Sequence, residues 1–280
     1  MTARKAKDFM LKLMIWFAVI FTVAILGILL YNIFSKGFAA VNWEFITGNY
    51  SRLHETYGIK NMILTTVYII GLTLLIAVPI SILAAIYLAE YAKPGKLLDL
   101  IRFTTESLAG IPSIIYGLFG YIFFVIILRM RYSILAGALT LSIMVLPIII
   151  RTTEESIKAT PKTFKEGSLA LGATKLYTLY KIILPSAMPG IITSVILSIG
   201  RIVGESAALI FTAGMVSRLP GGIFDSGRTL AVHMYALFAE GYASDQAQCW
   251  GTAVVLVILI IIINLIANLV GKGLKKDTQV

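Results

Sequence analysis

Two side chains that could bind an ion lie inside one apolar stretch, residues 186–214. Arg201 and Glu205 are its only charged residues. Small or polar residues recur there at intervals of three or four: Ser194, Ser198, Arg201, Glu205, Ala208 and Thr212. Residues at these intervals share one face of an α-helix, so the sequence predicts a helix with a polar stripe. The guanidinium of an arginine offers a planar set of donors that suits an oxyanion.

The depth of Arg201 decides what this stripe can face. A helix that begins near Pro189 places Arg201 about 18 Å along its axis, close to the middle of a bilayer. An arginine that faces lipid at that depth costs at least about 2.5–3.5 kcal/mol, so the stripe cannot face lipid. Either Arg201 and Glu205 neutralise each other inside the bundle, or the stripe belongs to a translocation pathway. We favour a pathway in which Glu205 holds Arg201 when no anion is bound; its members are Arg201, Glu205, Ser194, Ser198 and Thr212.

The composition excludes an ordinary soluble enzyme. Of the 280 residues 58% are hydrophobic and only 14% are charged, whereas soluble domains carry about a quarter charged residues. Cys249 is the only cysteine, which excludes an internal disulfide and a cysteine-cluster zinc site. His54 and Glu55 begin a zinc-protease motif, but Gly58 replaces its second histidine. Since the sequence also lacks a phosphate-binding loop and a nucleophile elbow, we expect no enzyme, no metal and no cofactor in this chain.

Six apolar stretches predict an all-α polytopic membrane protein. Each meets the requirement of about 17–25 apolar residues for crossing a bilayer. The predicted spans are residues 13–35, 61–90, 107–128, 132–150, 186–214 and 249–271. Sixteen of the 24 Lys and Arg lie on the side of the N-terminus and seven on the other side. This bias places both ends, residues 1–12 and 272–280, in the cytoplasm, and residues 36–60 and 215–248 outside.

The cytoplasmic insertion between the fourth and fifth spans, residues 151–185, has the pattern of two short helices. The dipeptide Thr160-Pro161 is typical of a helix N-terminus. Gly172 suits a left-handed corner, Thr174 can cap the second helix, and Pro185 is expected to end it. An interfacial helix pair, a DNA-binding helix-turn-helix and a docking element for a soluble partner all share this pattern. Two membrane attachments leave no room for a third helix, which argues against nucleic acid.

The insertion also resembles the coupling motif of ABC-importer permeases, E-A-A-x3-G-x9-I-x-L-P. Gly167 stands where alanine is usual, and the spacing is intact. The resemblance implies the type I importer permease fold, in which this insertion is a coupling helix that sits in a groove of the ATP-hydrolysing subunit. It assigns ATPase coupling to Glu166, Gly167, Ser168, Gly172, Leu184 and Pro185.

Further motifs narrow the resemblance to the phosphate importer permeases. They are IPSIIYGLFG at residues 111–120, ALTLSIMVLP at 138–147 and RTTEE at 151–155. Residues 204–213, GESAALIFTA, are similar to the form G-E-T-A-P-L-L-F-T-A of the PstA type, from which Ser206 and Ala208 depart. The sequence TLAVHMY at residues 229–235 also resembles that type.

The resemblance implies one half of the membrane pathway of an ATP-driven phosphate importer in a bacterial or archaeal plasma membrane. The implied partners are a second permease (PstC-like), an ATPase pair (PstB-like) that binds ATP and Mg, and an external phosphate-binding protein (PstS-like). Residues 215–248 are either a docking surface for that protein or a surface helix at the membrane edge. Two alternatives for the function stay open: an importer of another oxyanion, molybdate or sulfate, and a self-sufficient secondary transporter.

Overall fold

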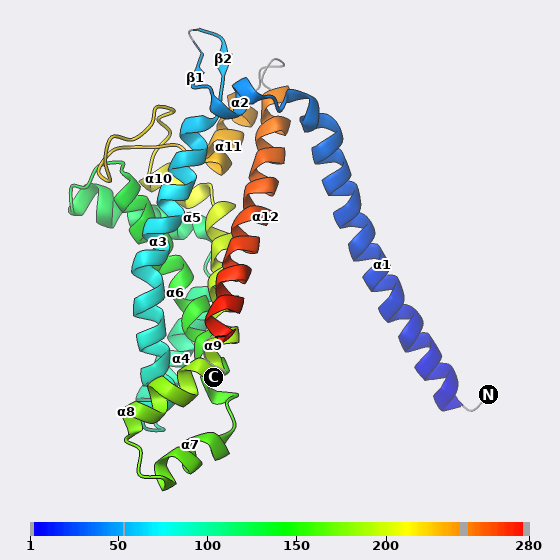
Figure 1. Ribbon diagram of the computed structural model, residues 1–280. Helices are drawn as coiled ribbons and strands as arrows, with labels where there is room; N and C mark the ends of the chain where they lie inside the picture. Colours follow the sequence, from blue (N-terminus) through cyan, green and yellow to red (C-terminus); the bar gives the residue numbers. More distant parts are fainter. Residues whose placement is uncertain (1–2, 53, 241–245, 277–280) are drawn as a thin grey trace.

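The computed structural model describes residues 3–52, 54–240 and 246–276, and it is almost entirely helical (Figure 1). The longer helices are α1 (Ala3–Gly37), α3 (Lys60–Ile86), α4 (Lys96–Ala109), α6 (Ile134–Lys158), α9 (Leu184–Val203), α11 (Leu230–Glu240) and α12 (Gln246–Lys276). The shorter ones are α2 (Trp43–Thr47), α5 (Ser113–Gly120), α7 (Lys162–Ala170), α8 (Lys175–Thr178), α10 (Ala207–Thr212) and a 3-10 turn (Phe38–Ala40). Three π-helical segments extend helices at Tyr87–Tyr91, Tyr121–Ile127 and Leu179–Ile183.

A two-stranded hairpin marks one end of the molecule and α7 marks the other. Strand β1 (Tyr50–Ser51) pairs antiparallel with β2 (Thr56–Tyr57), so that Tyr50 faces Tyr57. We call these two ends the hairpin end and the α7 end. In Figure 1, α1 begins on the side of the α7 end and runs to the hairpin end, whereas α12 begins at the hairpin end and finishes on the side of the α7 end.

The long helices confirm the prediction of a polytopic helical membrane protein. Five helices are long and apolar enough to cross a bilayer, and a bent helix pair raises the number to as many as six among the described residues. The five are Lys7–Ala40, Lys60–Tyr91, Ile134–Lys158, Lys175–Val203 and Gln246–Leu269; the pair is Lys96–Ala109 with Ser113–Ile127. Part of the predicted loop 215–248, namely residues 241–245, and residues 277–280 of the predicted tail lie outside the described residues.

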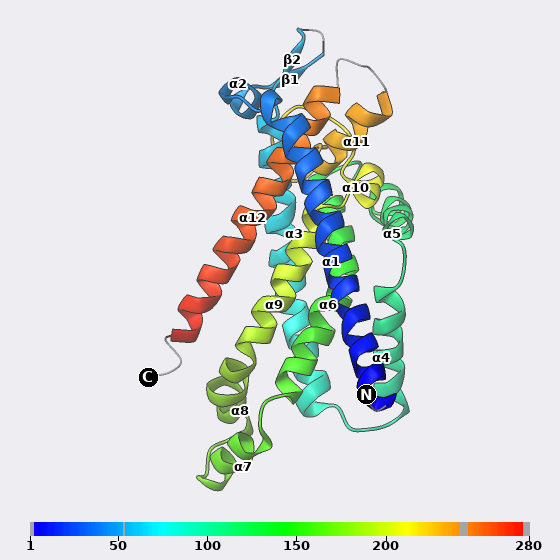
Figure 2. The ribbon, with the colours of Figure 1, turned by 90° about the vertical axis from the view of Figure 1, so that its right-hand side faces the viewer.

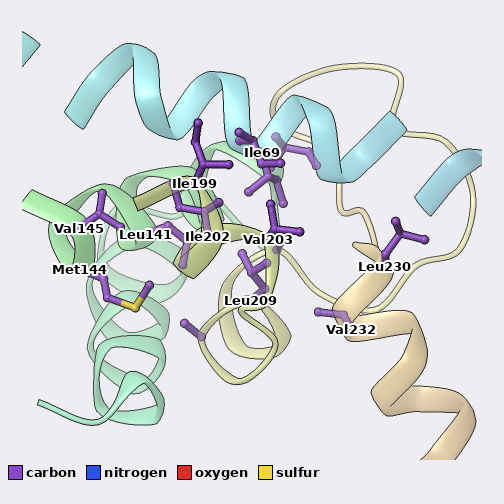
Figure 3. Packing of buried hydrophobic residues seen from close by; sticks show 14 of the residues in the cluster. Ile69, Leu141, Met144, Val145, Ile199, Ile202, Val203, Leu209, Leu230 and Val232 are labelled. Atoms are coloured by element: carbon purple, nitrogen blue, oxygen red, sulfur yellow. The ribbon is translucent and has the colours of Figure 1, made fainter. Parts of the chain in front are cut away.

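Helices α3, α6 and α9 form the core. Ile69 of α3, Leu141 and Met144 of α6, and Ile202 of α9 are all at most 2% exposed and belong to one apolar cluster (Figure 3). Leu209 of α10 also belongs to this cluster. These helices are apolar on most faces because their outer faces meet lipid. Close packing of side chains therefore stabilises this core in addition to the hydrophobic effect.

Helix α1 stands apart from this core. It meets α12 at the hairpin end and then diverges from the bundle (Figure 1). Its contact with α12 needs glycine at position 37, since a Cβ there would lie 2.3 Å from the carbonyl oxygen of Trp250. No residue in the most apolar stretch of α1 is buried by the rest of this chain.

The predicted third span, residues 107–128, is not one straight helix. It consists of the end of α4, a break at Gly110–Pro112, α5 and a π-helical segment, and its two parts are bent by 101°. Figure 2 shows α4 running along α6 and α5 turned away from it. Pro112 lacks an N–H group and adopts extended ψ of 140°, so the helix of α4 cannot continue through it.

Two features of the predicted fifth span are also different in the structure. Pro185 does not end a helix, because α8, the π-helical segment Leu179–Ile183 and α9 form one continuous run, Lys175–Val203. In the π-helical turn Leu184 N donates to Leu179 O, five residues back, which accommodates a proline lacking its own donor. The continuous helix predicted for residues 186–214 ends instead at Val203, and α10 begins at Ala207.

Candidate functional site

Arg201 lies in the last turn of α9 and is only partly exposed. Its guanidinium interacts electrostatically with Tyr116 of α5. The Tyr116 hydroxyl donates to the backbone oxygen of Leu108 at 2.7 Å, just before the break between α4 and α5. Arg201 is therefore positioned beside the broken span, where non-helical backbone interrupts an otherwise apolar bundle.

The predicted pair between Arg201 and Glu205 does not form. No ion pair of Arg201 is present among the described residues, and Glu205 points to the next helix instead. Its Oε1 accepts from Ala208 N at 3.0 Å and so caps the first turn of α10. The prediction was wrong because it assumed one unbroken helix, in which positions 201 and 205 would be one turn apart.

The three hydroxyl residues of the predicted pathway lie inside the bundle. Ser194, Ser198 and Thr212 are each 0% exposed. Their hydroxyls donate to backbone carbonyls of their own helices: Ser194 to Ile191 at 2.7 Å, Ser198 to Ser194 at 2.8 Å and Thr212 to Ala208 at 2.7 Å. These buried hydroxyl groups therefore find their hydrogen-bond partners within their own helices. Of the five predicted pathway residues, Arg201 alone is partly exposed.

A second candidate site projects at the α7 end. It consists of α7, α8 and the corner between them, residues 162–178, and we call it the coupling element after the role that the sequence resemblance predicts. Glu166 and Gly167 are exposed on α7, and the neighbouring Leu171 is 91% exposed. Gly172 has φ of +83°, the left-handed corner that the sequence predicts. Thr174 caps α8 as predicted, since its side chain accepts from Tyr177 N at 3.2 Å.

The other predicted coupling residues lie on the inner side of this element. Ser168 is buried, and its hydroxyl lies 2.9 Å from that of Thr178, which joins α7 to α8. Leu184 and Pro185 lie in the first turn of α9 and are half-buried. The six predicted residues thus divide into three at an exposed corner and three less exposed residues, of which Ser168 alone is buried.

Two clusters of charge near the α7 end were missed by the sequence analysis. Glu154 of α6 is 6% exposed and accepts from Arg102 of α4 at 2.6 Å and from Lys158 at 2.5 Å. Glu90, after α3, forms an ion pair with Lys165 of α7. Arg102 and Lys165 lie 52 and 75 residues from their carboxylate partners along the chain, so sequence spacing carries no signal for these two contacts. Only the contact between Glu154 and Lys158, four residues apart on one helix, has a spacing that indicates it.

The segment before α11 is tied down at the hairpin end. Arg228 Nη1 lies 3.2 Å from His233 Nδ1, and Arg228 Nε donates to Met215 O at 2.8 Å. His233 is 1% exposed, and its ring meets that of Tyr50 edge-on at 4.9 Å. Burial, helped by the positive charge of Arg228, lowers the pKa of His233 to about 3, so the ring is neutral and can accept from Arg228.

Helix α11 is consequently not a surface helix. Leu230 and Val232 are 0% exposed, and both belong to the main apolar cluster. Phe238 near its end is exposed, as is Tyr235 on another turn. Within the described residues no group of three or more His, Cys, Asp and Glu side chains could hold a metal ion.

Comparison with known proteins identifies related chains. The probable ABC transporter permease protein YqgI of Bacillus subtilis is 37% identical over 271 residues, which cover 90% of this chain and 92% of the relative. The phosphate transport system permease protein PstA of Pasteurella multocida is 31% identical over 269 residues, 95% of each chain.

The fold is shared with a solved importer. A chain in the crystal structure of a bacterial alginate ABC transporter, in complex with an alginate-bound periplasmic protein, matches with a TM-score of 0.70 at 16% identity, over 97% of this chain and 96% of the other. The family model of binding-protein-dependent transport system inner membrane components matches residues 77–279. Together with the five or six helices among the described residues that could cross a membrane, this match shows that the chain belongs to that family, the permease subunits of ABC importers.

Proposed function

We propose that this chain is one of two permease subunits of an ATP-driven phosphate importer and forms half of its translocation pathway. Relatives named as phosphate permeases of the PstA type, about 30% identical over most of the chain, support phosphate as the substrate. The observation that carries the proposal within the molecule is Arg201, a cation inside a membrane helix with no carboxylate partner among the described residues.

The position of Arg201 suits a site that an anion occupies briefly. A guanidinium without a counter-ion is costly inside an apolar bundle, so an anion that reaches it gains a charge-assisted, bidentate contact. The break between α4 and α5 lies beside it, and non-helical backbone at membrane depth is tolerated where it lines a cavity. We assign the direct contact with the anion to Arg201 alone. The other predicted residues stabilise helices α9 and α10: Ser194, Ser198, Glu205 and Thr212.

The other partners follow from the two ends of the molecule. We propose that the α7 end faces the cytoplasm, where the exposed corner at Glu166, Gly167 and Gly172 docks into an ATPase pair that binds ATP and Mg. The hairpin end would face outside and receive the phosphate-binding protein. A second permease subunit would complete the pathway on the face that carries Arg201 and supply further positive charge.

Radiolabelled phosphate uptake by the assembled transporter in vesicles tests the proposal. Arg201→Gln should lower uptake about 10- to 100-fold, the value of one charge-assisted hydrogen bond in a transition state. Arg201→Lys should retain an intermediate rate, and Arg218→Gln, the same charge change in an exposed loop, should leave uptake unchanged.

Competing anions decide between phosphate and the other oxyanions. Unlabelled phosphate should abolish uptake of the label, whereas sulfate and molybdate at equal concentration should not. Normal uptake by Arg201→Gln at normal membrane levels would remove Arg201 from the pathway. Uptake by the purified chain alone, without an ATPase, would favour a secondary transporter instead.

A further inference from the structure

The coupling element is attached to the bundle by more than its covalent connections. Along the chain α7 follows α6, and α8 continues into α9, so the backbone links the element to those two helices. Helix α3 lies far from it in sequence, yet it ends against it in space. Figure 1 shows the lower part of α3 above α7 and α8.

Glu90 makes the contact between α3 and the coupling element. It lies in the π-helical segment Tyr87–Tyr91 that prolongs α3, and its carboxylate forms an ion pair with Lys165 of α7. Lys175, at the start of α8, donates to the backbone oxygen of Glu90 at 2.9 Å and lies 4.1 Å above the ring of Tyr91. One short segment after α3 thus holds both helices of the element.

An apolar seam lies beside these polar contacts. Ile86, at the end of α3, belongs to a buried cluster with Ile157 of α6 and Leu179 and Ile183 of the π-helical segment after α8. The Ser168–Thr178 contact joins α7 to α8 within the same region. The coupling element and the end of α3 therefore pack together, and the ion pair of Glu90 is the polar contact between the end of α3 and α7.

The burial of Glu90 distinguishes this pair from ordinary surface pairs. Its side chain is 11% exposed and that of Lys165 is 35% exposed, whereas Arg151 and Glu106 pair with 56% and 57% of their side chains exposed. Exposed pairs are weakened by water and salt, and removing one member of a shielded pair leaves the other without a partner. Glu106 therefore provides a matched control.

We propose that Glu90 is a positioning residue that couples displacement of α7 directly to α3. A force applied by the ATPase at the exposed corner would then move α3 together with α6 and α9, rather than through the two covalent links alone. This inference rests on the proposed docking of the ATPase at that corner. It does not depend on phosphate being the substrate.

The first experiment measures how much transport each hydrolysed ATP supports. In the complete transporter in vesicles, Glu90→Gln should lower phosphate uptake per ATP about fivefold while the amount of co-purified ATPase stays the same. Lys165→Gln and the double variant should give the same loss as Glu90→Gln, because residues that act through one contact are not additive. Glu106→Gln should keep the wild-type ratio.

The second experiment is independent of the transported anion. Spin labels at Lys162→Cys on α7 and Leu83→Cys on α3, in a Cys249→Ser background, report the distance between the two helices in the assembled complex. The distance should be the same in the nucleotide-free and the ATP-trapped state, and should differ between the two states when Glu90→Gln is added.

These results separate the inference from the proposed function. A wild-type uptake ratio in Glu90→Gln, additive losses in the double variant, or a distance that changes with ATP equally with and without Glu90 would each overturn the coupling role. A wild-type complex that takes up no phosphate would overturn the proposed substrate, and the spin-label distances would still decide the role of Glu90.

Discussion

Glu205 allows a sharp test of whether its carboxylate serves the helix or the anion. In the structure Glu205 is 8% exposed and caps α10 through Ala208 N, with no ion pair to Arg201 among the described residues. Two substitutions separate these roles. Glu205→Ala removes both the acceptor and the charge, whereas Glu205→Gln removes the charge and keeps an acceptor oxygen.

The structure sets the size of each effect. Ala208 is 0% exposed, so removing the acceptor leaves a buried N–H group without its partner. Leaving such a group unsatisfied costs about 1–3 kcal/mol, and helix caps contribute a similar amount, about 0.5–2 kcal/mol. We expect Glu205→Ala to lower the free energy of unfolding by about 2 kcal/mol. Neutral hydrogen bonds have roughly half the strength of charge-assisted ones, so Glu205→Gln should lower it by about 1 kcal/mol.

Denaturant unfolding of the purified chain in detergent measures the stabilities, and phosphate uptake per assembled complex measures function. Since Glu205 does not hold Arg201, Glu205→Gln should keep uptake near the wild-type rate. Equal destabilisation by Ala and Gln would refute the capping role. Loss of uptake in stable, assembled Glu205→Gln would show instead that the charge itself takes part in transport.

Two further predictions concern packing and pH. Gly120→Ala should lower the free energy of unfolding by about 1–3 kcal/mol, because the new Cβ would lie 2.2 Å from Thr140 Oγ1 and 2.8 Å from Thr212 Cγ2. Thermal unfolding measures this loss. Gly71→Ala is the control in that assay, since its new Cβ meets nothing within 4 Å. For His233, the folded pKa of about 3 lies below the ordinary 6.5, so its contribution is complete above pH 6.5 and is lost as the pH falls towards 3. Acidification from pH 6.5 to 5.5 should lower the stability by about 1 kcal/mol through this group. His233→Gln should lack that part of the pH dependence, and an unchanged pH profile would place the effect in other groups.

Length and apolarity alone predicted most of the helices. A run of about 20 apolar residues must satisfy its own backbone hydrogen bonds in lipid, and a helix does so with local contacts only. The corner of the coupling element was also predictable, because it too depends on local contacts only. Gly172 and Thr174 act within one turn of their own backbone, and the structure has both in their predicted roles.

The candidate site was predictable in composition but not in geometry. The sequence singled out Arg201 and the small and hydroxyl residues in line with it; Ser194, Ser198 and Arg201 do lie on α9, whereas Thr212 ends the separate helix α10. It could not predict the break after Val203, since Gly204 is tolerated in a membrane helix and a helix continuing to Gly214 satisfies the local pattern equally well. That break decides that Glu205 caps α10 instead of pairing with Arg201.

The remaining contacts depend on how distant segments meet. Pro185 lies within a continuous helix because a π-helical turn precedes it, and Pro112 marks a bend of 101°. Glu90 reaches Lys165, which follows it by 75 residues. Local sequence determines which segments become helices and where chemistry-bearing side chains are available. Which of those side chains touch is a property of packing among helices far apart in the chain, and only the tertiary structure decides it.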